Sequence, residues 1–227
     1  MVRRNYFYPQ LIGLLGFVVI APIAQDYDLF DDRVIGALAT IILLIAGAVS
    51  LRGQGMRSIA AVTLAGLGTA SAGAVLFLDH KLLLVLMALT TVAFVSFSGV
   101  YAIRDVMQRG LIGGNELVGA VCVYINIAVF WAILYYLLEQ LDPGSFRDLV
   151  APEPELLEFV YISFVTLTTL GYGDIVPVSG AVRTLAYTQA GVGQFYIAVL
   201  VAGLVGTRLA RVTSDAPEHQ RGNGETP

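Results

Sequence analysis

The 227-residue chain is poor in charge and in cysteine. Only 13% of its residues are charged and 57% are hydrophobic, which excludes an ordinary soluble domain and predicts an integral membrane protein. Cys122 is the single cysteine, so one chain can form neither an internal disulfide nor a cysteine-based metal site. Acidic residues outnumber basic ones, with a formal net charge of −4, and we do not expect nucleic acid as a partner.

Charged residues are also missing from the centres of the long apolar stretches. A helix needs about 20 mainly apolar residues to cross a bilayer, and six stretches meet or approach that length. These predicted spans are residues 9–24, 34–51, 58–78, 82–103, 117–138 and 182–207. An ionisable side chain at a span centre costs about 2.5 to 3.5 kcal/mol and is typical of carriers. A carrier or membrane enzyme that uses the first four spans is therefore only the alternative class.

The first apolar stretch is short and has a second interpretation. Arg3 and Arg4 precede it, as in a signal peptide, and cleavage could then follow Ala24. That cut would place Pro22 at the minus-three position, where a small residue is required. We therefore expect the stretch to remain as the first span.

The arginines next to the predicted spans fall on one side of the membrane if six spans alternate. They are Arg3, Arg4, Arg52, Arg57, Arg104, Arg109, Arg208 and Arg211. The other side receives segments 25–33 and 79–81 and the acidic stretch 139–174. By the positive-inside rule, both termini are cytoplasmic and the segment between the fifth and sixth spans faces outward. We expect a multi-pass protein of a plasma membrane, prokaryotic because the polar tail is compact.

The segment between the fifth and sixth spans must partly re-enter the membrane. Residues 156–168 are apolar but too few to span, and Glu153 and Glu155 lie just before them. Acidic side chains favour the N-terminal end of a helix, so we expect a half-crossing helix that ends near Thr169. A helix that ends inside a bilayer must be buried in protein or line water, and its negative C-terminal end favours a cation.

The stretch TTLGYGDIVP at residues 168–177 places glycine at alternate positions, Gly171 and Gly173. If alternate residues take left-handed backbone angles, successive carbonyls can all turn toward one axis. This conformation costs about 1 to 2 kcal/mol for other L-residues and almost nothing for glycine. Leu170 and Tyr172 would then point outward and wedge against surrounding helices. Such a row of carbonyls can replace the water shell of an alkali cation.

The motif TTLGYGD, preceded by a short helix and followed by a long apolar one, resembles the pore signature of potassium channels. The resemblance covers residues 117–212. It implies a homotetramer in which each copy contributes one filter strand and K⁺ passes passively. The resemblance implies that the protein is not an enzyme, and it implies no cofactor other than the K⁺ ions in the filter. The implied K⁺-coordinating residues are Thr169, Leu170, Gly171 and Tyr172, while Gly173 and Asp174 complete the outer mouth.

Two positions depart from the family pattern. Tyr161 and Ile162 stand where many potassium channels have a pair of tryptophans, and Val165 stands where some have a glutamate that braces the outer aspartate. Tyr161 could still reach Asp174. Because the brace could be looser, a weakly selective cation channel stays an alternative.

The sixth predicted span contains a candidate hinge. Gly193 lies about where the resemblance places a glycine that lets the inner helix bend, and Gly191 is close to it. Tight helix packing is an equally open explanation for both glycines. The fourth predicted span has no basic residue before Arg104, which excludes a conventional voltage sensor because several gating charges are needed.

The expected fold class is an all-α membrane protein with six transmembrane helices, a re-entrant pore helix and an extended selectivity filter. We expect a four-span domain without a voltage sensor at residues 1–112, a pore domain at residues 113–212 and a disordered cytoplasmic tail at residues 213–227. The expected partners are further copies of the chain and the lipid bilayer. The sequence identifies no soluble regulator and no gating stimulus.

Overall fold

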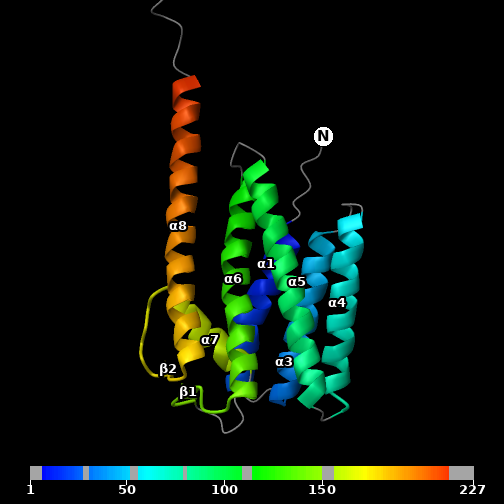
Figure 1. The fold of residues 1–227 in the computed structure, drawn as a ribbon. Coiled ribbons are helices and arrows are strands. Elements are labelled where there is room, and N and C mark those ends of the chain that lie inside the picture. Colours follow the sequence, from blue (N-terminus) through cyan, green and yellow to red (C-terminus); the bar gives the residue numbers. More distant parts are fainter. Residues whose placement is uncertain are drawn as a thin grey trace, which may run out of the picture.

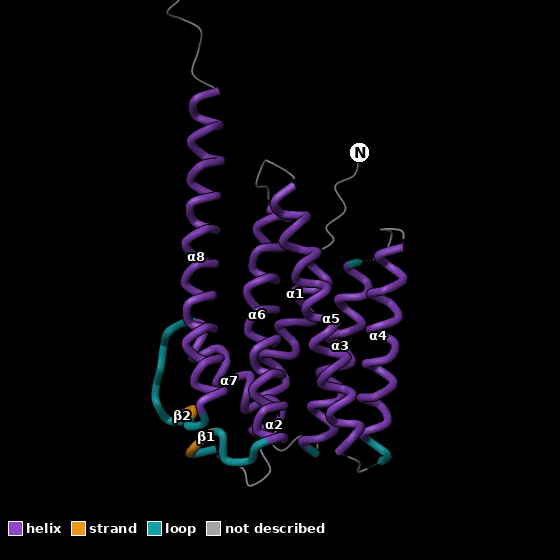
Figure 2. Tube along the Cα trace, viewed as in Figure 1, coloured by secondary structure: helices purple, strands orange, loops and turns teal. Residues whose placement is uncertain are grey.

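The structure is a computed structural model that describes residues 7–27, 31–51, 56–78, 81–108, 114–149 and 156–214. Most of these residues are helical, and two short strands lie together at one end of the molecule (Figure 2). The expected domain boundary between residues 112 and 113 lies outside the described residues. The expected tail also lies outside them from residue 215 onward.

The described part of the chain contains six long helical segments that run up and down beside one another (Figure 1). The first is formed by α1 (Phe7–Leu15), the π-helical turn η1 (Gly16–Ile20) and α2 (Ala21–Asp26). The others are α3 (Asp32–Ser50), α4 (Met56–Val75), α5 (Lys81–Gln108), α6 (Gly114–Leu141) and α8 (Gly180–Ser214). Between α6 and α8 lie β1 (Phe146–Arg147), the short helix α7 (Leu156–Leu167) and β2 (Val176–Pro177).

Four segments are long and apolar enough to cross a membrane, judged by length and composition. They are Phe7–Asp26, Leu82–Arg104, Leu117–Leu141 and Gly180–Gly203, which correspond to the first, fourth, fifth and sixth predicted spans. The second and third predicted spans also form helices, but their apolar parts, Val34–Ser50 and Ile59–Val75, are shorter. The apolar helices are those of a membrane protein, and the crossing of the membrane by α3 and α4 stays a prediction.

The ends of the helices alternate between the two ends of the bundle (Figure 1). At the upper end in that view, α3 ends and α4 begins, α5 ends and α6 begins, and α8 ends. The described helix ends next to the predicted basic segments therefore lie at one end of the bundle. β1, β2 and the start of α8 lie at the opposite end.

The first segment packs with one face against α3 and α6. Phe17 is fully buried. Gly13 permits the close contact with α3, because a Cβ at this position would lie 2.4 Å from the Cβ of Ala46. Gln10 Nε2 donates a buried hydrogen bond to Ser98 Oγ of α5 at 2.7 Å. These contacts make the first predicted span an integral part of the bundle described here.

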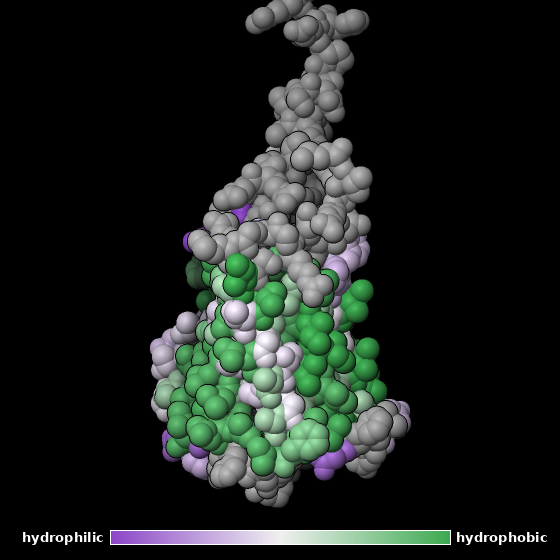
Figure 3. Space-filling model, turned by 90° about the vertical axis from the view of Figure 1, so that its right-hand side faces the viewer, coloured by the Kyte–Doolittle hydropathy of each residue, from purple (hydrophilic) through white to green (hydrophobic). Residues whose placement is uncertain are grey.

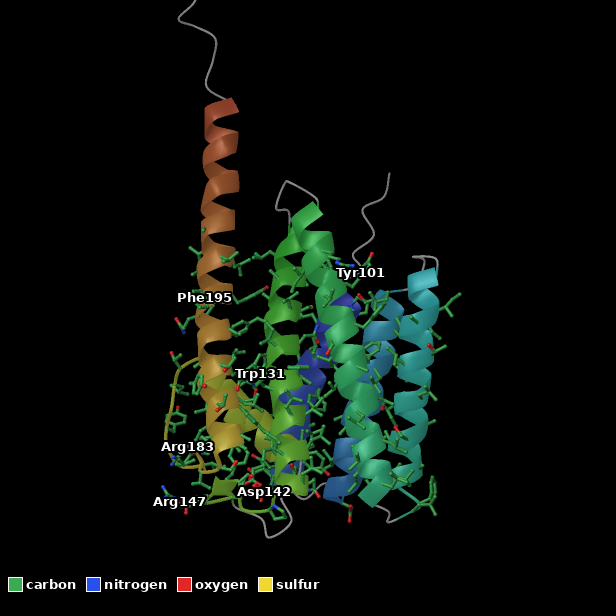
Figure 4. The ribbon with its side chains drawn as sticks, viewed as in Figure 1. Tyr101, Trp131, Asp142, Arg147, Arg183 and Phe195 are labelled. Carbon is green, nitrogen blue, oxygen red and sulfur yellow. The ribbon has the colours of Figure 1, made fainter. Side chains whose placement is uncertain are left out.

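α6 connects the first four segments to the rest of the chain. It packs against α1 and α5 and also against α7 and α8. Trp131 of α6 lies between α6 and α8 (Figure 4), where its indole N–H donates to Leu185 O at 3.2 Å. Nearer the other end of the two helices, Tyr196 OH of α8 donates to Ala120 O of α6 at 2.6 Å. α8 is thus tied to α6 at two levels.

The face of the bundle on the side of α4 is covered mainly by hydrophobic residues, with hydrophilic ones at its lower edge (Figure 3). A large apolar surface of this kind is unusual for a soluble monomer. Such a face is expected where a helix bundle borders lipid.

Candidate functional site

α7 is a short helix that aromatic contacts hold against α6. Phe159 of α7 is fully buried. Its ring meets Tyr136 of α6 edge-on, with 5.9 Å between centroids, and Phe146 of β1 with 5.4 Å. Pairs of this geometry contribute about 0.5 to 1.5 kcal/mol each beyond the buried area. The packing fixes the position of the loop that follows α7.

The C-terminal end of α7 closes with two hydrogen bonds of the Schellman type. Thr169 N donates to Thr166 O at 3.0 Å, and Leu170 N donates to Val165 O at 2.9 Å. In this motif the residue at the position of Thr169 takes left-handed angles and is usually glycine. Thr169 has a φ of +57°, which costs an L-residue about 1 to 2 kcal/mol. Sequence reasoning missed this conformation, because a β-branched residue gives no signal for it.

Left-handed residues alternate along the loop after α7. The φ angle is +59° at Gly171 and +76° at Gly173, the two positions that the glycine spacing predicted. With Thr169, every second residue from 169 to 173 is left-handed. This is the backbone alternation that we argued is needed to turn successive carbonyls to one side. Coordination of K⁺ by these carbonyls stays a prediction.

The side chains between the left-handed residues are exposed. Leu170 is 55% exposed and Tyr172 is 67% exposed. The loop runs along the side of α8 away from α6, and no described helix of this chain covers it there (Figure 1). That Leu170 and Tyr172 wedge against surrounding helices stays a prediction, which concerns the assembly of several chains.

Tyr161 of α7 reaches Asp174, the contact that the sequence left open. Its hydroxyl donates to Asp174 Oδ2, and the Ile175 amide donates to Asp174 Oδ1 at 3.0 Å. The hydrogen bond from Tyr161 is the main cause that holds the pKa of Asp174 below its ordinary value, because donors stabilise the ionised carboxylate. The outer end of the loop is thereby tied to α7.

Glu139 organises the turn that follows α6, and sequence reasoning gave it no role. Its side chain is buried, and its carboxylate oxygens accept from Gly144 N at 2.6 Å and Phe146 N at 3.1 Å. Gly144 has a φ of +87°, which glycine tolerates. Antiparallel pairing then places Phe146 of β1 opposite Pro177 of β2. Glu139 of α6 thus holds β1, and β1 in turn holds β2, the strand that follows the loop after α7.

A buried polar network connects α6, α7 and α8, and sequence reasoning missed it. Gln189 of α8 donates from Nε2 to Ser163 Oγ at 2.7 Å and to Ser163 O at 3.1 Å. Tyr135 OH donates to Gln189 Oε1 at 2.5 Å, and Ser163 Oγ donates to Ala128 O at 2.6 Å. Both ends of the buried amide are therefore paired, as buried polar groups require. The available sequence signal was Gln189 as a polar residue inside an apolar span.

The two candidate hinge glycines differ in their surroundings. A Cβ at Gly193 would lie 2.4 Å from Leu167 O and 2.9 Å from Leu167 Cδ1, so α8 contacts the end of α7 closely at this point. At Gly191, no atom of the described residues outside its own helix turn lies within 4 Å of a Cβ. α8 runs through both positions as one helix. Tight packing thus accounts for Gly193 and not for Gly191, and the hinge role of either residue stays a prediction.

Gln194 joins α8 to the inner end of the loop. Its Nε2 donates to Thr169 Oγ1 at 3.4 Å, at the long end of the hydrogen-bond range. The side chain is otherwise exposed. Sequence reasoning did not select Gln194, because nothing in the sequence relates it to a residue on the preceding loop.

Comparison with known proteins shows what this region is similar to. Residues 120–208 match the family described as Ion channel, a segment that includes most of α6, all of α7 and the loop, and most of α8. This part of the chain is therefore similar to the domains of that family.

A similar segment occurs in Two pore potassium channel c of Oryza sativa subsp. japonica. The two sequences are 32% identical over 63 residues, which cover 28% of this chain and 14% of the rice protein. The match thus spans a small part of that relative. No solved structure matches the chain significantly.

Proposed function

We propose that the protein is one subunit of a potassium-selective channel that conducts K⁺ passively across the membrane. The observation that carries the proposal is the alternation of left-handed residues at Thr169, Gly171 and Gly173, inside the segment that matches the ion-channel family. The carbonyl oxygens of residues 169–172, with the Thr169 hydroxyl at the inner end, replace the water shell of K⁺. Gly173 and Asp174 form the outer mouth.

Four chains surround the ion, because each chain supplies a single strand of oxygens. Large apolar side chains that a single chain leaves exposed support this assembly. On α8 they include Tyr187, Phe195 and Val199, at 69%, 75% and 71% exposure, and Phe195 lies at the edge of the molecule (Figure 4). Leu170 and Tyr172 are also exposed, on the loop that runs along the side of α8 away from α6 (Figure 1). A symmetric assembly would bury this surface between copies.

The contacts at the outer mouth favour a selective channel over a weakly selective one. Tyr161 donates to Asp174. Asp174 is therefore braced by a hydrogen bond from α7, although Val165 stands where some potassium channels have the bracing glutamate. Glu139 independently anchors the turn that leads to α7 through two backbone amides. A loop held at both ends resists the distortion that would let a smaller ion bind equally well.

The assembly resides in a plasma membrane with both termini cytoplasmic. This placement follows from the positive-inside rule applied to the basic segments, which adjoin one end of the bundle. The loop and the β1–β2 pair then face outward. The filter is reached from the cytoplasm along α8.

Reconstitution in liposomes under opposed K⁺ and Na⁺ gradients tests the proposal. We expect a reversal potential close to the K⁺ equilibrium potential, and a potential insensitive to the K⁺ gradient would contradict potassium selectivity. Gly171→Ala should abolish the flux while the protein stays in the membrane, because the left-handed angle at this position costs alanine about 1 to 2 kcal/mol more than glycine and favours a different course of the loop. Gly203→Ala is the matched control, since a Cβ there meets no described atom within 4 Å outside its own helix turn.

A further inference from the structure

The inner end of the loop presents an oxygen that a side chain of α8 already contacts. Thr169 Oγ1 accepts the hydrogen bond from Gln194 Nε2 at 3.4 Å. A hydroxyl oxygen has two lone pairs, and one that faces an amide hydrogen is less available to a cation. If the proposed function holds, Thr169 contributes to the innermost ring of ligands, so this contact modifies the ring directly.

We propose that Gln194 is a specificity-determining residue that weakens cation binding at the innermost ring of the filter. In the tetramer of the proposed function, on which this inference rests, four amide N–H groups direct their positive ends at that ring. The interaction energy of a charge with a dipole grows with the charge. The four amides therefore disfavour a divalent cation more than K⁺, and Gln194 limits how tightly divalent cations bind from the cytoplasmic side.

The position of Gln194 relative to Thr169 is set by the backbone on both sides. The next residue toward the start of α8, Gly193, contacts Leu167 O so closely that a Cβ would lie 2.4 Å from it, and Leu167 lies two residues before Thr169. One turn nearer the start of α8, Gln189 donates two hydrogen bonds to Ser163 of α7. These contacts fix the position of α8 relative to the end of α7. They therefore also fix where the Gln194 amide lies relative to Thr169.

Block of K⁺ current by Ba²⁺ applied from the cytoplasmic side tests the inference. Ba²⁺ is close to K⁺ in size and carries twice its charge, so it reports the local field at the ring. In planar bilayers with equal K⁺ on both sides, Gln194→Leu removes the N–H donor while keeping a similar volume. We expect Ba²⁺ to bind the variant roughly threefold to tenfold more tightly. This is the factor expected if the four long contacts together contribute about as much as one ordinary hydrogen bond.

Two further variants make the result specific. Gln194→Asn keeps an amide on α8 but is too short to reach Thr169, so Ba²⁺ block should tighten as it does with leucine. Thr188→Val is the matched control for loss of a polar group from α8, because the Thr188 hydroxyl donates to Thr184 O of the same helix at 2.8 Å. Its Ba²⁺ block should equal that of the unmodified protein.

The outcomes separate this inference from the proposed function. If the unmodified protein carries no K⁺-selective current, the proposed function fails. If it does carry one, unchanged or weaker Ba²⁺ block in Gln194→Leu overturns the role of Gln194. Should the leucine variant give no current, Gln194→Asn decides in the same way. An unchanged K⁺ over Na⁺ reversal potential in the variants shows that the filter itself is intact.

Discussion

Substitution of Gly193 by alanine tests whether α8 needs glycine for packing or for bending. A Cβ at this position would lie 2.4 Å from Leu167 O, 2.9 Å from Leu167 Cδ1 and 3.2 Å from Leu167 Cγ. The nearest of these atoms belongs to the backbone and cannot rotate away. α8 or the end of α7 must therefore move, and the end of α7 carries Thr169.

The size of the effect follows from comparison with Gly191→Ala. Overpacking a well-filled contact costs roughly 1 to 3 kcal/mol, while alanine is favoured over glycine in a helix interior by about 1 kcal/mol. The helix preference is the same for both variants. At Gly191 a Cβ meets no described atom within 4 Å outside its own turn, so only the gain applies. We therefore expect Gly193→Ala to be less stable than Gly191→Ala by roughly 1 to 3 kcal/mol.

The chain contains its own reporter for this experiment. Trp131 is the single tryptophan and lies at the α6–α8 contact, where its N–H donates to Leu185 O. Thermal unfolding in detergent, followed by tryptophan fluorescence, should place the midpoints of the two variants roughly 2 to 12 °C apart. Equal midpoints would refute the packing explanation. A change in open probability without a loss of stability in Gly193→Ala would support a hinge instead.

Three further outcomes concern the contacts around α7. Gln189→Leu leaves the Tyr135 hydroxyl without its acceptor and removes both hydrogen bonds that Ser163 accepts from Gln189. The loss should cost about 1 to 3 kcal/mol of stability; adding Tyr135→Phe should recover part of it, and strictly additive losses would argue against the network. Tyr161→Phe removes the donor to Asp174 and should speed the decay of K⁺ current during sustained opening; an unchanged decay would count against the brace. Because the pKa of Asp174 lies below its ordinary value of 3.8, the carboxylate stays ionised above that pH, and its contribution is lost only as the pH falls through the lowered pKa. Current decay should thus be the same at external pH 7 and pH 5, and faster decay already at pH 5 would contradict this assignment.

The features that could be predicted from the sequence are those in which residue type alone limits the structure. Apolar runs located the helices, and the alternate glycines Gly171 and Gly173 indicated left-handed angles, which their φ values confirm. Thr169 shows where this reasoning ends. Its left-handed angle is imposed by the way α7 closes on Thr166 O and Val165 O, so the cause lies in the surrounding structure and not in the residue.

The contacts that support the loop could not be predicted, because they join residues far apart in the chain. Tyr135 and Gln189 are 54 positions apart, and Thr169 and Gln194 are 25 apart. A glutamine in an apolar span indicates a hydrogen bond but not its partner. Glu139 was similarly hidden, because a carboxylate near a helix end is usually solvated, whereas here it binds two backbone amides.

The most direct test of the filter is to locate ions in the assembled protein. Rb⁺ is close to K⁺ in size and gives a usable anomalous X-ray signal. In crystals containing Rb⁺, we predict a row of anomalous difference peaks on a fourfold axis, level with the carbonyl oxygens of residues 169–172. An assembly without a fourfold axis beside this loop, or Rb⁺ peaks confined to other parts of each chain, would contradict coordination of K⁺ by these oxygens.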